Sequence, residues 1–457
     1  MPSPTIVWFR DDLRATDNPA LSWAAERGPV IGLYIHETVG RPLGAAAAWW
    51  LRRSLDALRE SLDAPLIECE GDPREILPRI AREHGAAVTW NRRYRLREVD
   101  EELKASLGAV SHPGFLLAEP WELSTSSSGA YRVFTPFYSA LRARLVHDFP
   151  QPLPRPEVSG APVEPVCVPR RDEPAWTHTL ARHNTPGEDA ALVRFHAFLD
   201  GCVNGERYDN NDLTPGATSG LSAHLRFGEI SPRYIWAQCV AACDTHPSAS
   251  DSIWAFLRQL AWRDFAWHRL YHHPDLAVRN VRAQFDRFPW EWTQHAVPGS
   301  TPRAFAHAEM DPQAHHLTEL AAWQSGHTGV PLVDAGMKQL WETGTMHNRV
   351  RMVVGSWLTK NLGIHWRHGE EWFWDTLVDA DDASNPFNWQ WVAGCGDDAA
   401  PYFRIFNPLT QREKFDPQGR YVARWAPEAC LPGYPEPMVD IKASRAQALA
   451  AYEIIKG

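Results

Sequence analysis

The spacing of hydrophobic residues changes part-way along the chain, and this change restricts the possible folds more than any other feature. Up to about residue 125, short β-branched runs alternate with longer amphipathic segments. The short runs predict strands over 5–9, 29–36, 65–71, 86–91 and 114–120. The longer segments predict helices, including one over 45–63 and one that begins at Pro73 behind an Asp72 cap. Strands separated by helices indicate a doubly wound, Rossmann-like parallel sheet.

The middle and the second half of the chain differ from the first part in composition and in hydrophobic periodicity. Ser-rich and Pro-rich stretches occupy 126–190, and prolines at that density predict a connector rather than a helix or a sheet interior. From 191 helical periodicity dominates to near residue 400. We therefore expect an α/β domain over 1–125, a connector over 126–190 and an all-α domain over 191–457.

Composition narrows the class of protein. Hydrophobic residues make up 44% of 457 residues, with no apolar run near the roughly 18–20 residues that a membrane span needs. The net charge of -10 restricts any nucleic-acid contact to a local patch. The seven scattered cysteines lack the spacing of a disulfide framework, which indicates that the protein lies in a reducing cytoplasm. No Gly-rich dinucleotide fingerprint follows the first strand, which disfavours a dehydrogenase.

Tryptophan is the commonest aromatic residue, with 22 copies, and most of them lie in the helical half. The segment 250–273 is apolar nearly all round, which predicts a buried helix. On it Gln259, Trp262 and Arg263 share one face. They could meet one ligand, or Arg263 could form an internal ion pair, and the pattern alone leaves both possibilities open.

Two further segments carry polar residues at helical spacing. In MHNRVRM, Asn348, Arg351 and Met352 share one face, with Arg349 turned away. Where a helix begins at 218–222, the hydroxyls of Thr218, Ser219 and Ser222 suit either an anion seat or an ordinary helix cap.

The segment 378–408 is the densest in chemical groups. The carboxylates of Asp379, Asp381 and Asp382 need cationic or ligand partners in so apolar a neighbourhood. A hard metal ion is conceivable, although alternating oxygen ligands are absent. Trp389 and Trp391, two apart on an expected helix, point to opposite sides.

These motifs, with WFRDDLRATDNPAL at 8–21, YRVFTPFYSAL at 131–141 and AWQSGHTGVPLVDAGMKQLW at 322–341, resemble the photolyase/cryptochrome flavoproteins over nearly the whole chain. The resemblance is closest to the class I type of cyclobutane pyrimidine dimer photolyase. It implies a carbon–carbon lyase, a deoxyribodipyrimidine photo-lyase, that splits dimers in UV-damaged DNA by electron transfer from light-excited reduced FAD.

The resemblance assigns cofactor roles to particular residues. Asn385 resembles the residue near flavin N5, which affects how readily the flavin holds its proton. Trp389, Trp366 and Trp323 resemble an electron-transfer chain from the flavin to the surface. Arg351 resembles the partner of Asp379 in the family. The remaining FAD-binding residues implied are Tyr208, Thr218, Ser219, Gly220, Leu221, Ser222, Phe256, Arg263, Asn348, Arg351, Asp379, Ala380 and Asp381.

A second set of residues resembles the DNA-contacting side of the family. Trp262 and Trp391 are similar to the rings that clamp a lesion flipped out of DNA. The other DNA- or lesion-binding residues implied are Gln259, Arg263, Asn348, Arg349, Met352, Arg404 and Gln411. No metal is implied, and a monomer is expected.

Three departures from the family pattern keep a second function open. Gln259 stands where repair enzymes usually have Glu, Gly220 replaces the arginine of the TSR form, and an arginine expected after Tyr208 is missing. Fewer cations weaken phosphate binding. The alternative is a cryptochrome-like blue-light photoreceptor with little or no repair. An antenna, methenyltetrahydrofolate or deazaflavin, is implied by the family, with Arg97 and Glu98 as candidates in what is otherwise a solvated turn.

Overall fold

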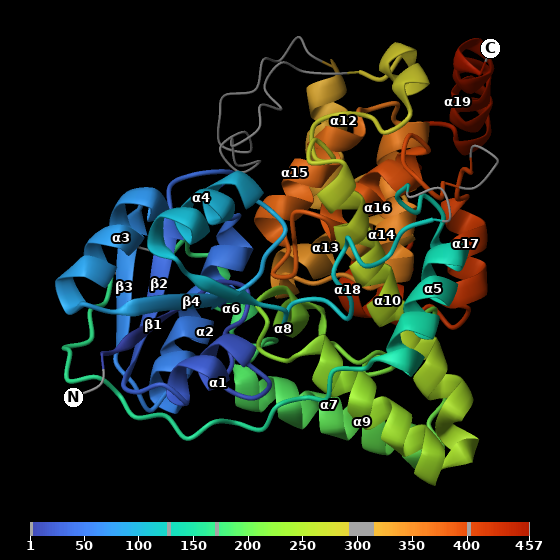
Figure 1. Ribbon diagram of the computed structural model, residues 1–457. Helices are drawn as coiled ribbons and strands as arrows, with labels where there is room; N and C mark the ends of the chain where they lie inside the picture. The colour runs from blue at the N-terminus through green and yellow to red at the C-terminus, as the bar shows by residue number, and fades with distance from the viewer. Residues whose placement is uncertain (1–2, 126–128, 170–172, 292–314, 400–403, 457) are drawn as a thin grey trace.

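The computed structural model describes residues 3–125, 129–169, 173–291, 315–399 and 404–456. An α/β half with one sheet lies beside a helical half, and the chain ends in the helical half (Figure 1). The expected fold class is confirmed. No helix in these described ranges has both the length and the apolar character of a membrane span.

The sheet is parallel throughout, with strand order β3-β2-β1-β4-β5. All five residues of its central strand β1 are buried, as expected for a sheet covered on both faces. The elements of this half are β1 (Thr5–Phe9), α1 (Pro19–Ala25), β2 (Val30–Glu37), α2 (Ala45–Ser61), β3 (Leu66–Gly71), α3 (Pro73–His84), β4 (Ala87–Asn91), α4 (Arg97–Leu107) and β5 (Val110–His112). Asp72 caps α3 as predicted, since its side chain accepts a hydrogen bond from Arg74 N.

The strand predicted over 114–120 is wrong. The last strand of the described residues, β5, lies earlier, and residues 114–120 form no strand. Phe115, Leu116 and Leu117 are buried in a cluster with residues of the helical half. These residues are therefore apolar because they are buried between the two halves. Hydrophobicity alone does not distinguish such a segment from a buried strand.

The helical half is built around α10 (Ser250–His272), the long buried helix predicted from the sequence. Its other helices are α5 (Phe134–His147), α6 (Thr177–Leu180), α7 (Glu188–Val203), α8 (Ser222–Arg226), α9 (Pro232–Thr245), α12 (His315–Ser325), α13 (Pro331–Thr343), α14 (Asn348–Ser356), α15 (Trp366–Thr376), α16 (Ser384–Ala393), α17 (Pro408–Phe415), α18 (Arg420–Trp425) and α19 (Ile441–Ile455). A π-helical turn, η3 (Trp357–Asn361), follows α14 directly, and short 3-10 turns lie at 247–249, 283–287 and 427–430.

The segment expected as a connector contains α5 and then an extended stretch, which passes along the lower edge of the α/β half (Figure 1). Val30 N donates a hydrogen bond to Ser159 O at 2.8 Å, and Ala161 N donates to Val30 O at 2.9 Å. The stretch is thus attached to the start of β2. Parts of the predicted connector, 126–128 and 170–172, lie outside the described residues.

The two halves meet closely where β1 ends. Arg226 of α8 donates to Asp11 Oδ1 at 2.7 Å and to Ala380 O at 2.9 Å. A Cβ on Gly228, whose φ is +64°, would lie 2.0 Å from Asp11 O, so only glycine permits this approach. The contact fixes the loop that follows Val378 against the α/β half.

Candidate active site

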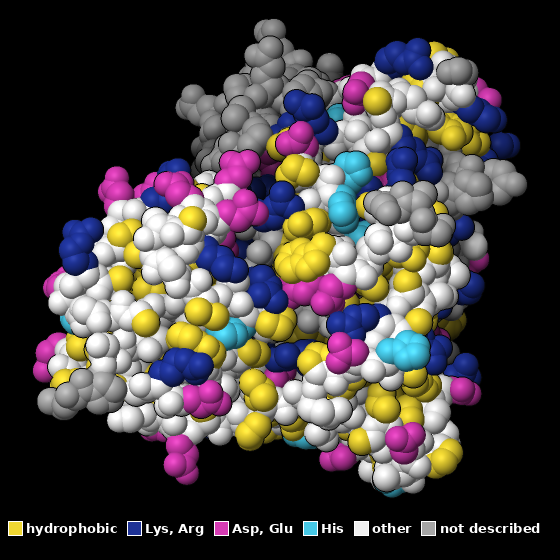
Figure 2. Space-filling view, in the orientation of Figure 1, with side chains coloured by type: hydrophobic (Ala, Val, Ile, Leu, Met, Phe, Trp, Pro, Cys, Tyr) yellow, Lys and Arg dark blue, Asp and Glu magenta, His cyan; other side chains and the backbone are white. Residues whose placement is uncertain are grey.

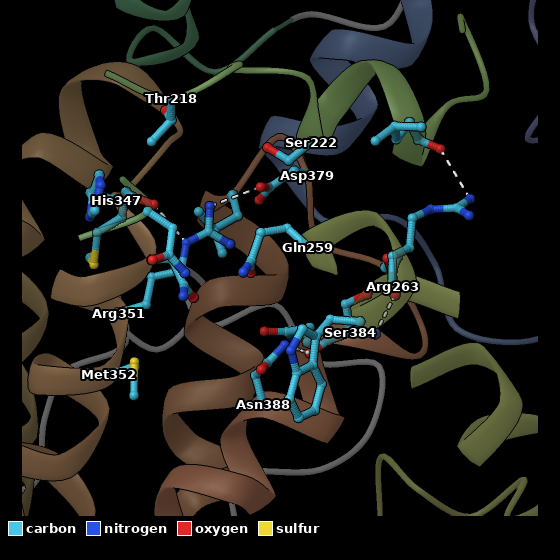
Figure 3. Close-up of a pocket in the computed structure, with 18 of the residues that line it drawn as sticks. Thr218, Ser222, Gln259, Arg263, His347, Arg351, Met352, Asp379, Ser384 and Asn388 are labelled. Atoms are coloured by element: carbon cyan, nitrogen blue, oxygen red, sulfur yellow. Dashed lines mark hydrogen bonds and ion pairs between the residues drawn. The ribbon is translucent and has the colours of Figure 1, made fainter. Parts of the chain in front are cut away.

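A cavity of about 540 Å³ opens among α10, α14, α16 and the segment 218–222 of the helical half. Helices far apart in the sequence each contribute one face, and Figure 3 shows Gln259 between the Arg351–Asp379 pair and Asn388. Most of the residues singled out in the sequence line this one cavity: Tyr208, Thr218, Ser219, Gly220, Leu221, Ser222, Phe256, Gln259, Trp262, Arg263, Asn348, Arg349, Arg351, Met352, Asp379, Ala380, Asp381, Asn385, Trp389 and Trp391.

Small hydroxyl residues form one edge of the cavity. The helix α8 begins at Ser222, while Thr218 and Ser219 belong to the preceding loop. The residue that caps α8 is Leu221, with no side-chain hydrogen bond, so the ordinary cap expected as the alternative is wrong. The hydroxyls of this loop therefore face the cavity without a capping role.

Gly220 lies in the same loop with a φ of +63°. A Cβ at this position would come within 2.7 Å of Arg194 Nη1. The glycine therefore suits the left-handed backbone, and Arg194 brings a guanidinium close to the position where the family has an arginine.

An ion pair crosses the floor of the cavity. Arg351 Nη2 lies 2.8 Å from Asp379 Oδ2, which is the pairing expected from the sequence, and Arg351 Nε also donates to Met346 O at 2.8 Å. The other oxygen, Asp379 Oδ1, is buried and has no hydrogen-bond partner among the described residues. A buried carboxylate oxygen without a partner is costly, so the cavity presents an acceptor suited to a ligand N–H or O–H.

Asp381 is held differently. Its Oδ1 accepts a hydrogen bond from Ala383 N at 2.8 Å and another from Ser384 N. Burial raises the pKa of Asp381, and these backbone hydrogen bonds oppose that rise. Because Asp379 and Asp381 have separate partners, the conceivable metal site gains no support, and the described part of the chain contains no cluster of three metal-ligating side chains.

The face of α10 that carries Gln259, Trp262 and Arg263 does turn to the cavity. Arg263 donates to Phe115 O at 2.8 Å and to Leu225 O at 3.3 Å, while its neighbour Asp264 lies 3.6 Å away. The expected internal ion pair is therefore a minor contact, and carbonyl groups hold the guanidinium.

Trp262 is supported from behind. Its ring stacks on Phe134 with a centroid distance of 3.7 Å and an interplanar angle of 6°. One face of the indole is thus covered by a residue of α5, and the side chain still lines the cavity. A ring fixed in this way can present a flat surface at low entropic cost.

Comparison with known proteins now places the chain. Residues 5–157 match the family model described as DNA photolyase, and residues 256–431 match the FAD binding domain of DNA photolyase. The chain is 41% identical to a deoxyribodipyrimidine photo-lyase of Agrobacterium fabrum, over 99% of this chain and 98% of the relative. It belongs to the DNA photolyase family.

Two solved structures extend the match. A bacterial class III photolyase from Agrobacterium tumefaciens has a TM-score of 0.88 and 40% identity, covering 100% of this chain and 98% of that chain. A cryptochrome from Synechocystis has a TM-score of 0.81 and 27% identity, covering 99% of each chain. The class named by the first structure differs from the class I type suggested by the motifs.

The second lesion-clamp candidate of this photolyase-family cavity is Trp391. Its ring lies beside Phe406, and its Nε1 donates to Asp398 O at 3.0 Å. Trp389 makes different contacts, with Trp323 and Phe373. The two indoles of α16 therefore reach different neighbours, as their spacing predicted.

Two of the three tryptophans of the expected electron path are in direct contact. Trp323 touches Trp389 directly, with centroids 6.1 Å apart, and it is fully buried. The expectation that Trp323 is the surface end of the path is therefore wrong. Trp366 is also fully buried, with its Nε1 bonded to Asn280 Oδ1 at 2.8 Å, and it begins the helix on which Gly369 packs against Trp389.

Arg349 corrects a second expectation, since it lines the cavity edge instead of turning away. Its Nε donates to Asn211 Oδ1 at 3.0 Å, and the guanidinium lies 4.5 Å from the Phe415 ring centroid. Arg404 and Gln411 lie outside the cavity lining, with Arg404 exposed. The DNA contacts expected of these two residues stay a prediction.

Sequence reasoning missed His347, which caps α14 and lines the cavity. Its Nδ1 accepts a hydrogen bond from Arg349 N, and its Nε2 is buried without a partner among the described residues. Burial lowers the pKa of His347 to about 4, so the ring is neutral at pH 7. Its position beside Asn348 was the available signal.

The surface around the site is not uniformly basic. Figure 2 shows acidic side chains gathered over α4, and Lys and Arg side chains between the two halves and along the helical half. Of the antenna candidates, Arg97 lies over the Tyr271 ring at 4.4 Å, and Glu98 is exposed at the start of α4. The contact with Tyr271 gives Arg97 a role between the halves that does not depend on a ligand.

Proposed function

We propose that this protein is a light-driven deoxyribodipyrimidine photo-lyase that uses FAD to split cyclobutane pyrimidine dimers in UV-damaged DNA. The observation that carries the proposal is one cavity that contains both the unpartnered Asp379 oxygen and two tryptophan rings, Trp262 and Trp391. A flavin needs the first feature, and a flipped-out dimer needs the second.

The residues present fit FAD. Asp379 Oδ1 offers an unused buried acceptor, and Arg351 compensates the charge of the same carboxylate. The hydroxyls of Thr218, Ser219 and Ser222 supply neutral donors for phosphate oxygens. Tyr208 and Phe256 close that end with apolar surface, as partners in one aromatic cluster.

When bound and reduced, FAD supplies a light-excited electron donor for cleavage of the cyclobutane bonds. The protein's own residues bind, orient and exclude water. Trp262 and Trp391 hold the unstacked bases, Gln259 offers an amide to a thymine edge, and Asn348 and Met352 fill the adjoining face. Asn385 of α16 lines the same cavity, and its side chain would face the bound flavin.

Trp389 and Trp323 form the inner part of the proposed electron path, since their rings are in contact at 6.1 Å. Trp366 joins this path through helix α15, which packs against Trp389 at Gly369. The contact between Trp389 and Trp323 is compatible with hopping between neighbouring indoles.

The second candidate function is a cryptochrome-like photoreceptor. The similarity to the Synechocystis cryptochrome structure and the uncharged residues Gln259 and Gly220 favour it. It predicts photoreduction of the flavin without dimer repair. The stacking of Phe134 on one face of Trp262 favours repair, because it holds the indole in place as part of a lesion clamp. A light sensor needs no such clamp.

One sample tests both candidates. The purified full chain is examined for a flavin absorption spectrum and then for blue-light restoration of thymine-dimer DNA. A flavin spectrum with light-dependent repair is expected; a flavin spectrum without repair supports the photoreceptor, and no flavin spectrum contradicts both.

The proposal extends to location, oligomeric state and a second chromophore. We propose that the protein acts in the cytoplasm, because its seven cysteines are free thiols. We also propose that it acts as a monomer. A folate or deazaflavin antenna at the interface of the two halves remains part of the proposal, with Arg97 and Glu98 as candidate contacts. A second chromophore band in the same spectrum would test it.

A further inference from the structure

The loop between β2 and α2, residues 38–44, reaches from the α/β half to helix α15. Trp374 Nε1 donates to Pro42 O at 2.9 Å, and Ala45 N donates to Asp375 Oδ1 at 2.8 Å. A Cβ on Gly44 would lie 1.9 Å from Trp374 O, so the backbones touch here. The C-terminal part of the loop is therefore attached to α15.

Arg41 is the charged residue of this loop. Its two terminal nitrogens lie 2.8 and 2.9 Å from the two carboxylate oxygens of Glu370, and its guanidinium lies 4.1 Å from the Trp374 ring centroid. The Glu370 side chain is 1% exposed. Burial opposes the charge of Arg41, yet the ion pair with Glu370 raises the pKa of Arg41.

Glu370 in turn holds Asn385. Asn385 Nδ2 donates to Glu370 O at 2.9 Å and to Glu370 Oε1 at 2.8 Å. A carbonyl and a carboxylate only accept hydrogen bonds, so they fix the NH₂ side of the amide toward α15. Asn385 Oδ1 has no partner in the described part of the chain, and the residue lines the cavity.

We propose that Arg41 is a positioning residue which, through Glu370, keeps the Asn385 carbonyl oxygen facing the cavity and so sets the proton affinity of the bound flavin. The inference rests on the proposed flavin function. It assigns to the α/β half a part in tuning the cofactor of the helical half, separate from any antenna.

The physical basis is the state of Glu370. Without Arg41, the Glu370 carboxylate stays buried, and Arg367 of the same helix is the described cation left to compensate its charge. Arg367 also pairs with Glu371. A poorly compensated buried carboxylate takes up a proton. The acid can then donate to Asn385 Oδ1, so that only the Glu370 backbone carbonyl still favours the original orientation of the amide. The amide can turn over and present its NH₂ to the flavin.

The test is the Arg41→Met variant of the full chain loaded with FAD. In this variant the flavin N–H faces the Asn385 NH₂, a donor, in place of the Asn385 carbonyl oxygen, an acceptor. Protonation of the one-electron-reduced flavin is therefore disfavoured. We expect the pH at which half of that form carries a proton to fall by about one unit, a tenfold loss of proton affinity. Absorption bands of the two protonation states provide the readout.

Three variants separate positioning from simple damage. Arg41→Lys keeps one positive charge and should recover most of the shift. Glu370→Gln needs no counter-ion, so adding Arg41→Met to it should cause little further change. Arg53→Met is the matched control, because Arg53 pairs with Glu173 at 2.8 and 3.1 Å and lies 4.1 Å from Trp49 without a link to the cavity.

Two outcomes overturn the inference. One is a shift in Arg41→Met no larger than in Arg53→Met, measured where the wild type binds flavin and repairs dimers. The other applies if the Arg41→Met variant loses its flavin. The infrared carbonyl band of a protonated carboxylic acid should then appear in Arg41→Met and vanish when Glu370→Gln is added. A variant without this band contradicts the inference. A wild type without flavin would instead contradict the proposed function.

Discussion

The ring of Trp389 lies against the backbone of Gly369, so closely that a Cβ on that glycine would come within 2.1 Å of the indole. Gly369 is inside α15, where its own conformation does not require glycine. Its role is therefore to make space for the indole that stands between the cavity and Trp323.

Gly369→Ala should displace Trp389 and cost about 1–3 kcal/mol of unfolding free energy through overpacking. We also expect slower photoreduction of the flavin, because the contact between Trp389 and Trp323 is disturbed. Denaturant unfolding and the rate of flavin reduction under blue light measure the two effects. Gly201→Ala is the control, since the added Cβ meets only the end of the flexible Glu206 side chain; an equal effect there would contradict the explanation.

Asp379→Asn should weaken flavin retention. The change removes the charge opposite Arg351 and replaces an acceptor by a group that can also donate, at a cost of about 1.5–3 kcal/mol, roughly 10- to 150-fold in affinity. Flavin release on dilution measures it. Asp72→Asn, which alters an Arg-paired carboxylate outside the cavity, should leave retention unchanged.

Phe134→Ala should weaken binding of dimer-containing DNA although Phe134 does not line the cavity. The reason is that Trp262 loses the ring on which it stacks and becomes mobile. We expect a loss below the roughly 1–3 kcal/mol that stacking on one base provides, with Trp262→Ala showing the full loss. A titration of dimer-containing DNA measures both, and equal affinity for Phe134→Ala and wild type would show that the support is irrelevant.

Arg349→Gln should reduce the salt dependence of DNA binding. If this guanidinium contacts one phosphate, the slope of log K against log salt falls by about 0.9. Binding at several salt concentrations gives the slope. The loss should be similar for damaged and undamaged DNA, because a phosphate contact carries no information about the lesion.

Stability should fall in acid partly because of His268. Burial lowers the pKa of this ring to about 3 from 6.5, and its Nε2 accepts a hydrogen bond from Tyr131 N at 3.1 Å. Between these pH values the unfolded chain binds a proton that the native chain does not, so unfolding free energy decreases as pH falls, by about 1.4 kcal/mol per pH unit for one group. His268→Gln can still accept the hydrogen bond and should show a smaller slope in unfolding measured from pH 7 to 4.

Four of the five predicted strands and the long helix α10 could be predicted from the sequence because their hydrophobic period records burial on a regular element. The segment 114–120 could not, since its burial comes from contact with the other half. Periodicity reports that a residue is covered, not which element covers it.

The candidate site divides in the same way. Arg351 could be paired with Asp379 from the resemblance, and the structure contains the pair. The covering of Trp262 by Phe134 and the link from Arg41 to Asn385 join residues more than a hundred positions apart. Their spacing in the sequence contains no local signal, because only the packed fold brings them together.

The crossing of residues 115–118 into the helical half limits how this architecture can be divided. Leu117 N donates to Asp264, and Phe115 O accepts from Arg263, a residue of the cavity wall. A helical fragment expressed alone would lose these partners and expose an apolar surface. If the α/β half were replaced by that of a relative, residues 115–118 would therefore have to stay with the helical half to keep these contacts.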